Sequence, residues 1–252
     1  MTMITRSEDY IEYCRETARH LRDIQDLALR GKDKQPITRR IQERILQAIE
    51  LCPDDDMIDI GCGDGTLLRM AQPRVHSAIG LLATEEEAAL VRALGLQVRQ
   101  GFTDQLPLEN ESASVVVCNN VLLVVPRDKI SPSLREMYRV AKPGARIFIG
   151  EIPLEPGPPP EPEFASAGAT LAYLYRKYGM RTFLGMLRRM IYWKLARQPM
   201  IIRGGSTISF YAQPKDFIAM GAAAGLRLVR SWPHNDWPDN RYNYLFRKEK
   251  RT

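Results

Sequence analysis

The sequence is poor in cysteine and histidine and has no long hydrophobic run. Its 252 residues include four cysteines and three histidines. The cysteines form no CxxC pair and have no metal-ligand spacing, which argues against a disulfide scaffold and a metal site. No window approaches the roughly 18 apolar residues of a membrane span, and the first residues lack the apolar core of a secretory signal. We therefore expect a cytoplasmic protein with reduced thiols and no bound metal.

The positive charge that the sequence does carry is concentrated in one stretch. The chain is 44% hydrophobic and 26% charged, with a net charge of +6, which excludes disordered and collagen-like classes. Between Phe164 and Arg203 there are eight Lys and Arg and no acid, so this stretch carries +8 and the remainder carries −2. We expect a basic cap that attracts a phosphate- or carboxylate-bearing acceptor, or an anionic surface.

Apolar periodicity predicts two N-terminal helices within residues 1–52, then a run of alternating strands and helices over 57–151. The helices are expected over Glu8–Arg30 and from Pro36 to before Pro53. Alternation at this spacing is typical of a doubly wound, mostly parallel sheet in an α/β fold. The expected elements of the run are strands at Met57–Ile60, Ser77–Leu82, Gln97–Gln100, Ser114–Cys118 and Arg146–Glu151 and helices at Thr66–Ala71, Thr84–Leu94 and Ser133–Val140.

Residues 153–206 interrupt this pattern with a helical, basic insertion. The insertion opens on the proline-rich segment Pro153–Pro162, which we interpret as a stiff spacer, with an SH3-type ligand as the alternative. Strand and helix patterns return over 207–252. The four expected elements there are Thr207–Tyr211, helix Pro214–Ala224, Leu226–Trp232 and Asn243–Arg247. We therefore expect one domain of 252 residues with an insertion.

The most informative motif is the glycine turn Gly61-Cys62-Gly63-Asp64-Gly65, between the first strand of the run and a helix. Glycines allow positive φ and a close approach of ligand to backbone, and open α/β sheets bind ligands at this end of their strands. The GxGxxG fingerprint of nicotinamide cofactors would need glycine at Thr66. A phosphate-binding loop would need a GK[ST] sequence that is absent. The spacing therefore disfavours both.

Asp59–Gly65 resembles the first motif of the class I S-adenosylmethionine (SAM)-dependent methyltransferases, a family with a Rossmann-like seven-stranded sheet. Arg139–Arg146 is similar to that family's run before strand five, and Gly101–Pro107 to its stretch before strand four. Gln213–Phe217 followed by Ala224–Leu226 is similar to its last helix and turn. The resemblance implies SAM as cofactor, with S-adenosylhomocysteine as product. The cofactor-binding positions that it implies are Asp59, Gly61, Cys62, Gly63, Gly65, Leu82, Phe102, Thr103, Asp104, Cys118 and Asn119, with Asn120 as a further candidate to orient the acceptor.

Three positions depart from the family pattern. Leu82 stands where an acid usually grips the ribose, Phe102 where an acid lies near the adenine, and Ser114 where an aspartate opens strand four. Loss of a carboxylate that binds the ribose costs about 1.5–3 kcal/mol. Glu85 and Asp104 are the nearby candidates to compensate, with a solvated helix or loop acid as the alternative interpretation of each.

Methyl transfer to oxygen benefits from a general base. Glu151, at the end of strand five, and His234, in a loop with two tryptophans, are the candidate catalytic residues. His20 lies on the polar side of the first helix, and His76 precedes strand two, so both are weaker candidates.

The helical stretch Arg181–Leu195 is amphipathic and leaves three interpretations open. Its apolar side either packs as a lid over the site, rests on an anionic membrane or lipid-linked substrate, or belongs to a nucleic-acid surface. We expect a SAM-dependent methyltransferase (EC 2.1.1 type) acting on a small-molecule or glycan-precursor acceptor, at oxygen. The alternatives are a non-catalytic scaffold with a decayed cofactor site and a nucleic-acid methyltransferase.

Overall fold

The computed structural model describes residues 35–154, 210–234 and 241–249, together with positions 11 and 15 and scattered helical positions between 168 and 195. A seven-stranded sheet forms the centre of the described part, in the order β3-β2-β1-β4-β5-β7-β6. β7 is antiparallel to both β5 and β6, and the other strand pairs are parallel. This confirms the expected α/β class and its mostly parallel, doubly wound sheet.

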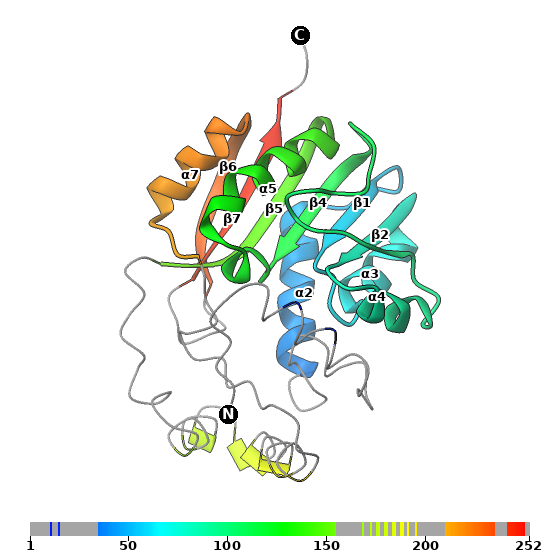
Figure 1. Cartoon of the computed structure of the whole chain (residues 1–252), viewed down its shortest axis with the longest axis vertical. Coiled ribbons are helices and arrows are strands. Elements are labelled where there is room, and N and C mark those ends of the chain that lie inside the picture. Colours follow the sequence, from blue (N-terminus) through cyan, green and yellow to red (C-terminus); the bar gives the residue numbers. More distant parts are fainter. Residues whose placement is uncertain are drawn as a thin grey trace.

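The strands and helices alternate along the chain as expected (Figure 1). The strands are β1 (Asp56–Ile60), β2 (Ser77–Leu82), β3 (Val98–Gln100), β4 (Ala113–Asn119), β5 (Ala141–Pro153), β6 (Leu226–His234) and β7 (Arg241–Lys248). The helices are α2 (Gln35–Ile49), α3 (Thr66–Ala71), α4 (Glu85–Arg92), α5 (Arg127–Val140) and α7 (Pro214–Ala223), with short 3-10 helices η3 (Gln72–Arg74) and η4 (Leu122–Val124).

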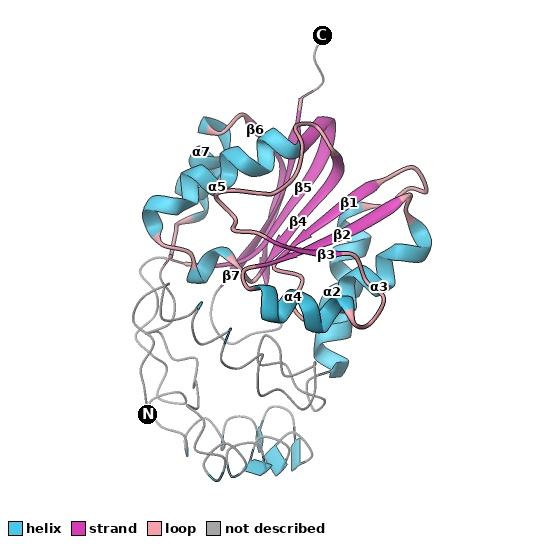
Figure 2. Ribbon diagram, turned by 45° about the vertical axis from the view of Figure 1, so that its right-hand side comes forward, coloured by secondary structure: helices cyan, strands magenta, loops and turns pink. Residues whose placement is uncertain are grey.

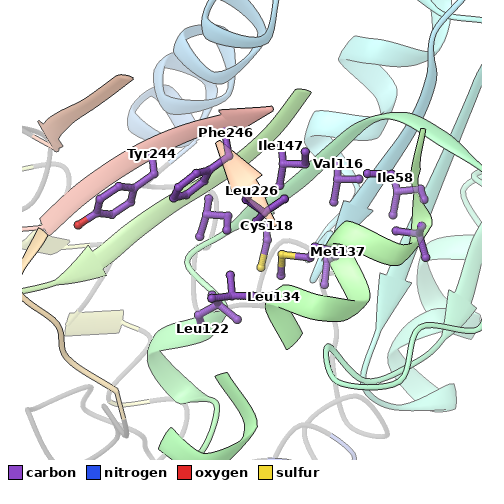
Figure 3. Packing of buried hydrophobic residues seen from close by; sticks show 14 of the residues in the cluster. Ile58, Val116, Cys118, Leu122, Leu134, Met137, Ile147, Leu226, Tyr244 and Phe246 are labelled. Carbon is purple, nitrogen blue, oxygen red and sulfur yellow. The ribbon is translucent and has the colours of Figure 1, made fainter. Parts of the chain in front are cut away.

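Apolar side chains cover both faces of the sheet. One buried cluster joins Ile58, Val116 and Ile147 of the central strands to Leu134 and Met137 of α5 (Figure 3). On the other face, residues of α2 and α3 pack against alternate residues of the same strands, which include Val117 and Phe148. Because side chains in a strand alternate between faces, each central strand contributes to both clusters, as expected for a sheet covered on both sides.

Three expectations differ from the structure. α5 begins at Arg127, not at Ser133, and continues through Pro132 in its second turn, where the proline removes one i→i−4 hydrogen bond. β5 begins at Ala141, not at Arg146, so Lys142-Pro143-Gly144 lies inside this strand, at an irregularity in its pairing with β4. Phe210 and Tyr211 are irregular, so the strand expected over Thr207–Tyr211 is wrong for these two residues. Most of the helix expected over Glu8–Arg30, and most of 153–206, lies outside the described residues.

No helix in the described ranges is long and apolar enough to cross a bilayer. Cys52, Cys62 and Cys118 are free thiols.

Candidate functional site

The carboxyl ends of β1, β2, β4 and β5 lie at one edge of the sheet, which we call the carboxyl edge (Figure 2). Because parallel strands end on the same side, the glycine turn after β1, Leu82 after β2 and Asn119 at the end of β4 meet there. Ile60, the last residue of β1, pairs with Cys118 of β4. The glycine turn therefore begins directly beside Asn119.

The glycine turn requires a backbone that only glycine adopts easily. Gly61, Gly63 and Gly65 have φ of 71°, 55° and 72°. A Cβ on Gly61 would lie 2.3 Å from Val121 Cγ2, and one on Gly65 would lie 2.4 Å from Leu96 Cδ1. Gly61 N donates to Leu81 O at 2.8 Å, which ties the turn to β2. The turn is a fixed backbone cradle that a ligand can approach closely.

The acid and the two thiols near the glycine turn are all buried. Asp59, the next-to-last residue of β1, is 4% exposed. Burial, with the charge of Asp59 as the second cause, raises the pKa of the Cys62 and Cys118 thiols. Both thiols stay protonated at neutral pH and are poor nucleophiles. The Cys62 side chain faces the core, since a Cβ on Gly80 would lie 2.6 Å from its Sγ.

At the end of β2 the ribose position is apolar. Leu82 is 6% exposed and packs in a buried cluster with Leu68, Val91 and Val98. The next residues begin α4: Thr84 N-caps this helix and donates from its hydroxyl to Glu87 Oε2 at 2.8 Å, while Glu87 N donates to Thr84 Oγ1. These two hydrogen bonds cap the helix and order the loop.

The two acids expected to compensate for Leu82 each have a cationic partner. Glu85 accepts a hydrogen bond from Arg92, and Asp104 accepts one from Lys129 Nζ at 2.7 Å. Thr103 is held by the Ser133 hydroxyl of α5 at 2.7 Å. Phe102, at the expected adenine position, is 41% exposed. The expected adenine position therefore presents an exposed aromatic ring rather than a carboxylate.

Ser114 lies at the opposite edge of the sheet, because it stands at the start of β4. Its hydroxyl donates to Asp55 Oδ1 at 2.7 Å and accepts from Asp56 N at 3.0 Å. It ties β4 to the start of β1. Its departure from the family pattern therefore has no contact with the carboxyl edge and no bearing on the cofactor position.

A buried polar cluster surrounds Glu151 beside the glycine turn. Glu151 is 1% exposed and has φ of 61° in a bulge, where the pairing of β5 with β7 shifts between Ile149 and Ile152. Asn119 Nδ2 donates to Glu151 Oε1 at 2.9 Å, and Arg241 Nη1 donates to Glu151 Oε2 at 3.1 Å. Arg241 Nη1 also donates to Asn120 Oδ1 at 3.0 Å. The bulge thus brings the carboxylate of β5 between the ends of β4 and β7.

His234 joins the same cluster through Asn243. Glu151 N donates to Asn243 Oδ1 at 3.0 Å, and Asn243 Nδ2 lies 3.4 Å from His234 Nδ1. His234 is 9% exposed, and its Nε2 is buried with no hydrogen-bond partner among the described residues. Glu151 and His234, which are far apart in sequence, are therefore linked by one side chain.

Sequence reasoning missed Arg241 and Asn243. The only signal is that they are the two polar residues at alternate positions in a strand that is otherwise rich in Tyr, Leu and Phe. His76 is at the opposite edge, with its Nδ1 2.9 Å from Asp56 Oδ1, and His20 lies outside the described residues. No three His, Cys, Asp or Glu side chains group as metal ligands in the described part of the chain.

Comparison with known proteins found a protein family that matches part of the chain. Residues 58–149 match the family described as "Methyltransferase domain". A malonyl-[acyl-carrier protein] O-methyltransferase of Serratia marcescens is 28% identical over 118 residues, 46% of this chain and 46% of that protein. A ubiquinone biosynthesis O-methyltransferase of Hahella chejuensis is 32% identical over 111 residues, 41% of this chain and 46% of that protein. The chain thus spans less than half the length of these relatives.

A solved structure shares the fold over most of its length. The SAM-dependent methyltransferase of Methanosarcina mazei superposes with a TM-score of 0.56 at 16% identity, over 82% of this chain and 98% of that one. At this identity the likeness concerns the fold, and both chains have the same arrangement of layers.

Proposed function

We propose that the chain, whose residues 58–149 match a methyltransferase domain, is a class I SAM-dependent methyltransferase that transfers a methyl group from SAM to an oxygen of a small-molecule or glycan-precursor acceptor. The observation that carries this proposal is that the glycine turn after β1 lies directly beside the buried polar cluster around Glu151. The turn suits the cofactor and the cluster suits a polar acceptor, so the two reactants would meet at the end of β4.

The described residues fit SAM best at its methionine end. Asp59 and the backbone of Gly61, Gly63 and Gly65 would hold the amino acid part, where the positive φ values keep the backbone accessible. Phe102, Thr103 and Asp104 would border the adenine, with Leu82 as an apolar neighbour of the ribose. Cys118 and Asn119 would lie near the reacting methyl group. When bound, SAM supplies an electrophilic methyl group.

The protein's own part is to hold the acceptor oxygen in line and to exclude water. Asn119 is fixed by its hydrogen bond to Glu151 and by its contact with Gly150, where a Cβ would lie 2.1 Å from Asn119 Oδ1. Arg241 fixes the other oxygen of Glu151. Because these side chains are already held in place, they would not need to reorganise during the reaction.

For the acceptor, we propose an anionic and partly apolar molecule that reaches the site past the basic stretch Phe164–Arg203. The support lies in helical positions of this stretch: Leu184, Ile191 and Leu195 are 53%, 52% and 79% exposed, beside the basic residues Arg176 and Arg188. Apolar and basic side chains together suit a lipid-linked or acyl-bearing anion, or an anionic membrane surface.

Isothermal titration calorimetry with SAM and with S-adenosylhomocysteine tests the proposed function. Binding of both at micromolar concentration is the expected result. Absence of binding up to millimolar concentration would contradict it and would favour the scaffold alternative. Co-sedimentation with vesicles of anionic or zwitterionic lipid tests the acceptor-side proposal, which expects binding to the anionic vesicles alone.

A further inference from the structure

The hydrogen bonds around Asn243 fix which way its amide points. Glu151 N is a backbone donor, so the Asn243 atom 3.0 Å from it must be the carbonyl oxygen Oδ1. The amide nitrogen Nδ2 then faces His234 Nδ1 at 3.4 Å. Because Nδ2 carries only hydrogens to donate, Nδ1 accepts, and the proton of the neutral imidazole is on Nε2.

His234 therefore presents an N–H group that is buried and has no partner among the described residues. A buried donor without an acceptor is costly, and a ligand oxygen would remove that cost. His234 ends β6 and pairs in register with Arg241 of β7, so this donor lies at the carboxyl edge, on the acceptor side of the Glu151 cluster.

Both carboxylate oxygens of Glu151 also have hydrogen-bond partners in the protein. One carboxylate oxygen accepts from Asn119 and the other from Arg241, with the side chain 2% exposed. Both acceptor oxygens of this carboxylate are therefore engaged with protein donors. The carboxylate fixes the orientations of Asn119 and Arg241, and the backbone N–H of Glu151 fixes that of Asn243.

We propose that His234 and Glu151 position the acceptor and do not act as general bases, and that the acceptor is a carboxylate held by the His234 Nε2–H group. This inference rests on the proposed function. In the transfer, a lone pair of the carboxylate oxygen forms the new C–O bond as the methyl–sulfur bond breaks. The negative charge of the carboxylate and the positive charge of the sulfonium cancel. The products are a methyl ester and a thioether, and no proton moves.

The hydrogen-bond direction is tested first, by long-range ¹H–¹⁵N NMR of the histidine rings in the full-length protein. The chain has three histidines, and the His234→Gln variant assigns the signals of His234. A protonated Nε2 and a pyridine-like Nδ1 are expected. A proton on Nδ1, or on both nitrogens, at neutral pH overturns the inference.

Acceptor binding is tested second, with octanoate and its neutral counterpart 1-octanol as probes on protein saturated with S-adenosylhomocysteine. Octanoate is expected to bind and to shift His234 Nε2, whereas 1-octanol leaves it unchanged. His234→Gln keeps an amide N–H near the position of Nε2 but provides no base, so octanoate affinity should stay within about threefold. His234→Ala should lose about 10- to 100-fold, the range for a hydrogen bond to a charged group.

His76→Gln is the matched control, because His76 lies at the opposite edge of the sheet and touches Asp56. It should bind octanoate as the unchanged protein does. Methyl ester formation should follow affinity, so that His234→Gln rescues most of the activity that His234→Ala loses. A loss of 10²-fold or more in the turnover number of this variant at saturating octanoate would instead identify a base. That result, or an octanoate affinity that does not change in His234→Ala, overturns the inference.

Calorimetry with S-adenosylhomocysteine distinguishes a failure of this inference from a failure of the proposed function. If S-adenosylhomocysteine binds and the histidine carries its proton on Nδ1, the inference fails while the proposed function stands. If S-adenosylhomocysteine does not bind, the proposed function fails and the carboxylate acceptor fails with it.

Discussion

Gly61 and Gly95 both have positive φ, of 71° and 80°, but their surroundings differ. A Cβ on Gly61 would lie 2.3 Å from Val121 Cγ2, while a Cβ on Gly95 would meet nothing within 4 Å. We expect Gly61→Ala to displace the turn and to weaken SAM binding at least tenfold by calorimetry. Gly95→Ala should lose only about 1–2 kcal/mol of stability, the cost of the left-handed conformation, with SAM affinity unchanged. Equal SAM affinity in the two variants would argue against the turn as the cofactor cradle.

Leu82 is a second position where one substitution is informative, because it tests whether a carboxylate there would bind the ribose of SAM or would only disturb the packing. An aspartate there would supply the ribose ligand that the family pattern has, but the side chain is packed against Leu68 and Val98. A carboxylate buried among these residues is costly. We expect Leu82→Asp to lower the melting temperature, and to tighten SAM binding if the carboxylate reaches the ribose. Leu82→Asn, which is similar in size and uncharged, is the control for packing loss. Calorimetry below both melting temperatures compares the SAM affinities.

At the scale of elements, the bulge in β5 is what assembles the buried polar cluster around Glu151. It turns Glu151 toward the ends of β4 and β7, where Arg241 and Asn119 hold its two oxygens. Glu151→Ala leaves a buried guanidinium without its carboxylate, which costs about 3–5 kcal/mol. Urea unfolding should show this loss in the free energy of unfolding.

Two further variants distinguish the stability lost with the ion pair from the stability lost with side-chain packing at the bulge in β5. Glu151→Gln retains a hydrogen-bonding oxygen and should lose less than Glu151→Ala. The double variant Glu151→Ala/Arg241→Met removes both charges and should recover part of the loss. If the double variant is as unstable as the sum of its two single variants, the pair does not couple β5 to β7 in the way described.

At the scale of the whole molecule, the edge opposite the site is held by two ionised aspartates. Hydrogen bonds from His76, Lys142 and Ser77 hold the pKa of Asp56 well below its ordinary value of 3.8. Burial raises the pKa of Asp55, but hydrogen bonds from Cys52 N, Ser114 and Arg146 outweigh it, so that pKa is also lowered. These contacts connect the start of β1 to β2, β4 and β5.

Because the pKa values of Asp55 and Asp56 are lower in the folded state than in the unfolded chain, the folded state should lose stability as the pH falls. Above about pH 5 both aspartates are ionised in the folded and unfolded chain, and their contribution is complete. As the pH falls below 3.8, the unfolded chain takes up protons first, so the free energy of unfolding should decrease. Urea unfolding at pH 7, 4 and 3 measures this decrease. Asp56→Asn should be less stable at pH 7 and should lose less between pH 4 and pH 3. An equal loss in both proteins would assign the acid sensitivity to other groups.

Much of the architecture was predictable because local patterns carry it. Strand–helix alternation predicted the sheet and the order of its elements, and the bounds of β2 and α3 agree with the structure to the residue. α5 was predicted too short, since the expected helix Ser133–Val140 leaves out the residues from Arg127 to Pro132, through which the helix in fact runs. The strand expected at Tyr211 failed because its apolar residues pack under η4 and β5 without pairing: Phe210 N donates to Leu123 O and Ala212 N to Pro153 O.

The sequence by itself determined the glycine turn, and with it the resemblance to a methyltransferase family, the cofactor that this resemblance implies and the edge of the sheet where the candidate site lies, because glycine spacing after a buried strand is a local property. It also indicated Glu151 from its place at a strand end, and Asn119 through the family resemblance. Only the tertiary structure decided which groups contact Glu151, because two of its partners, Arg241 and Asn243, come from β7, some 90 residues further along the chain, through a bulge that no local pattern signals. The direction of the hydrogen bonds through Asn243 to His234 is likewise set by contacts across three strands.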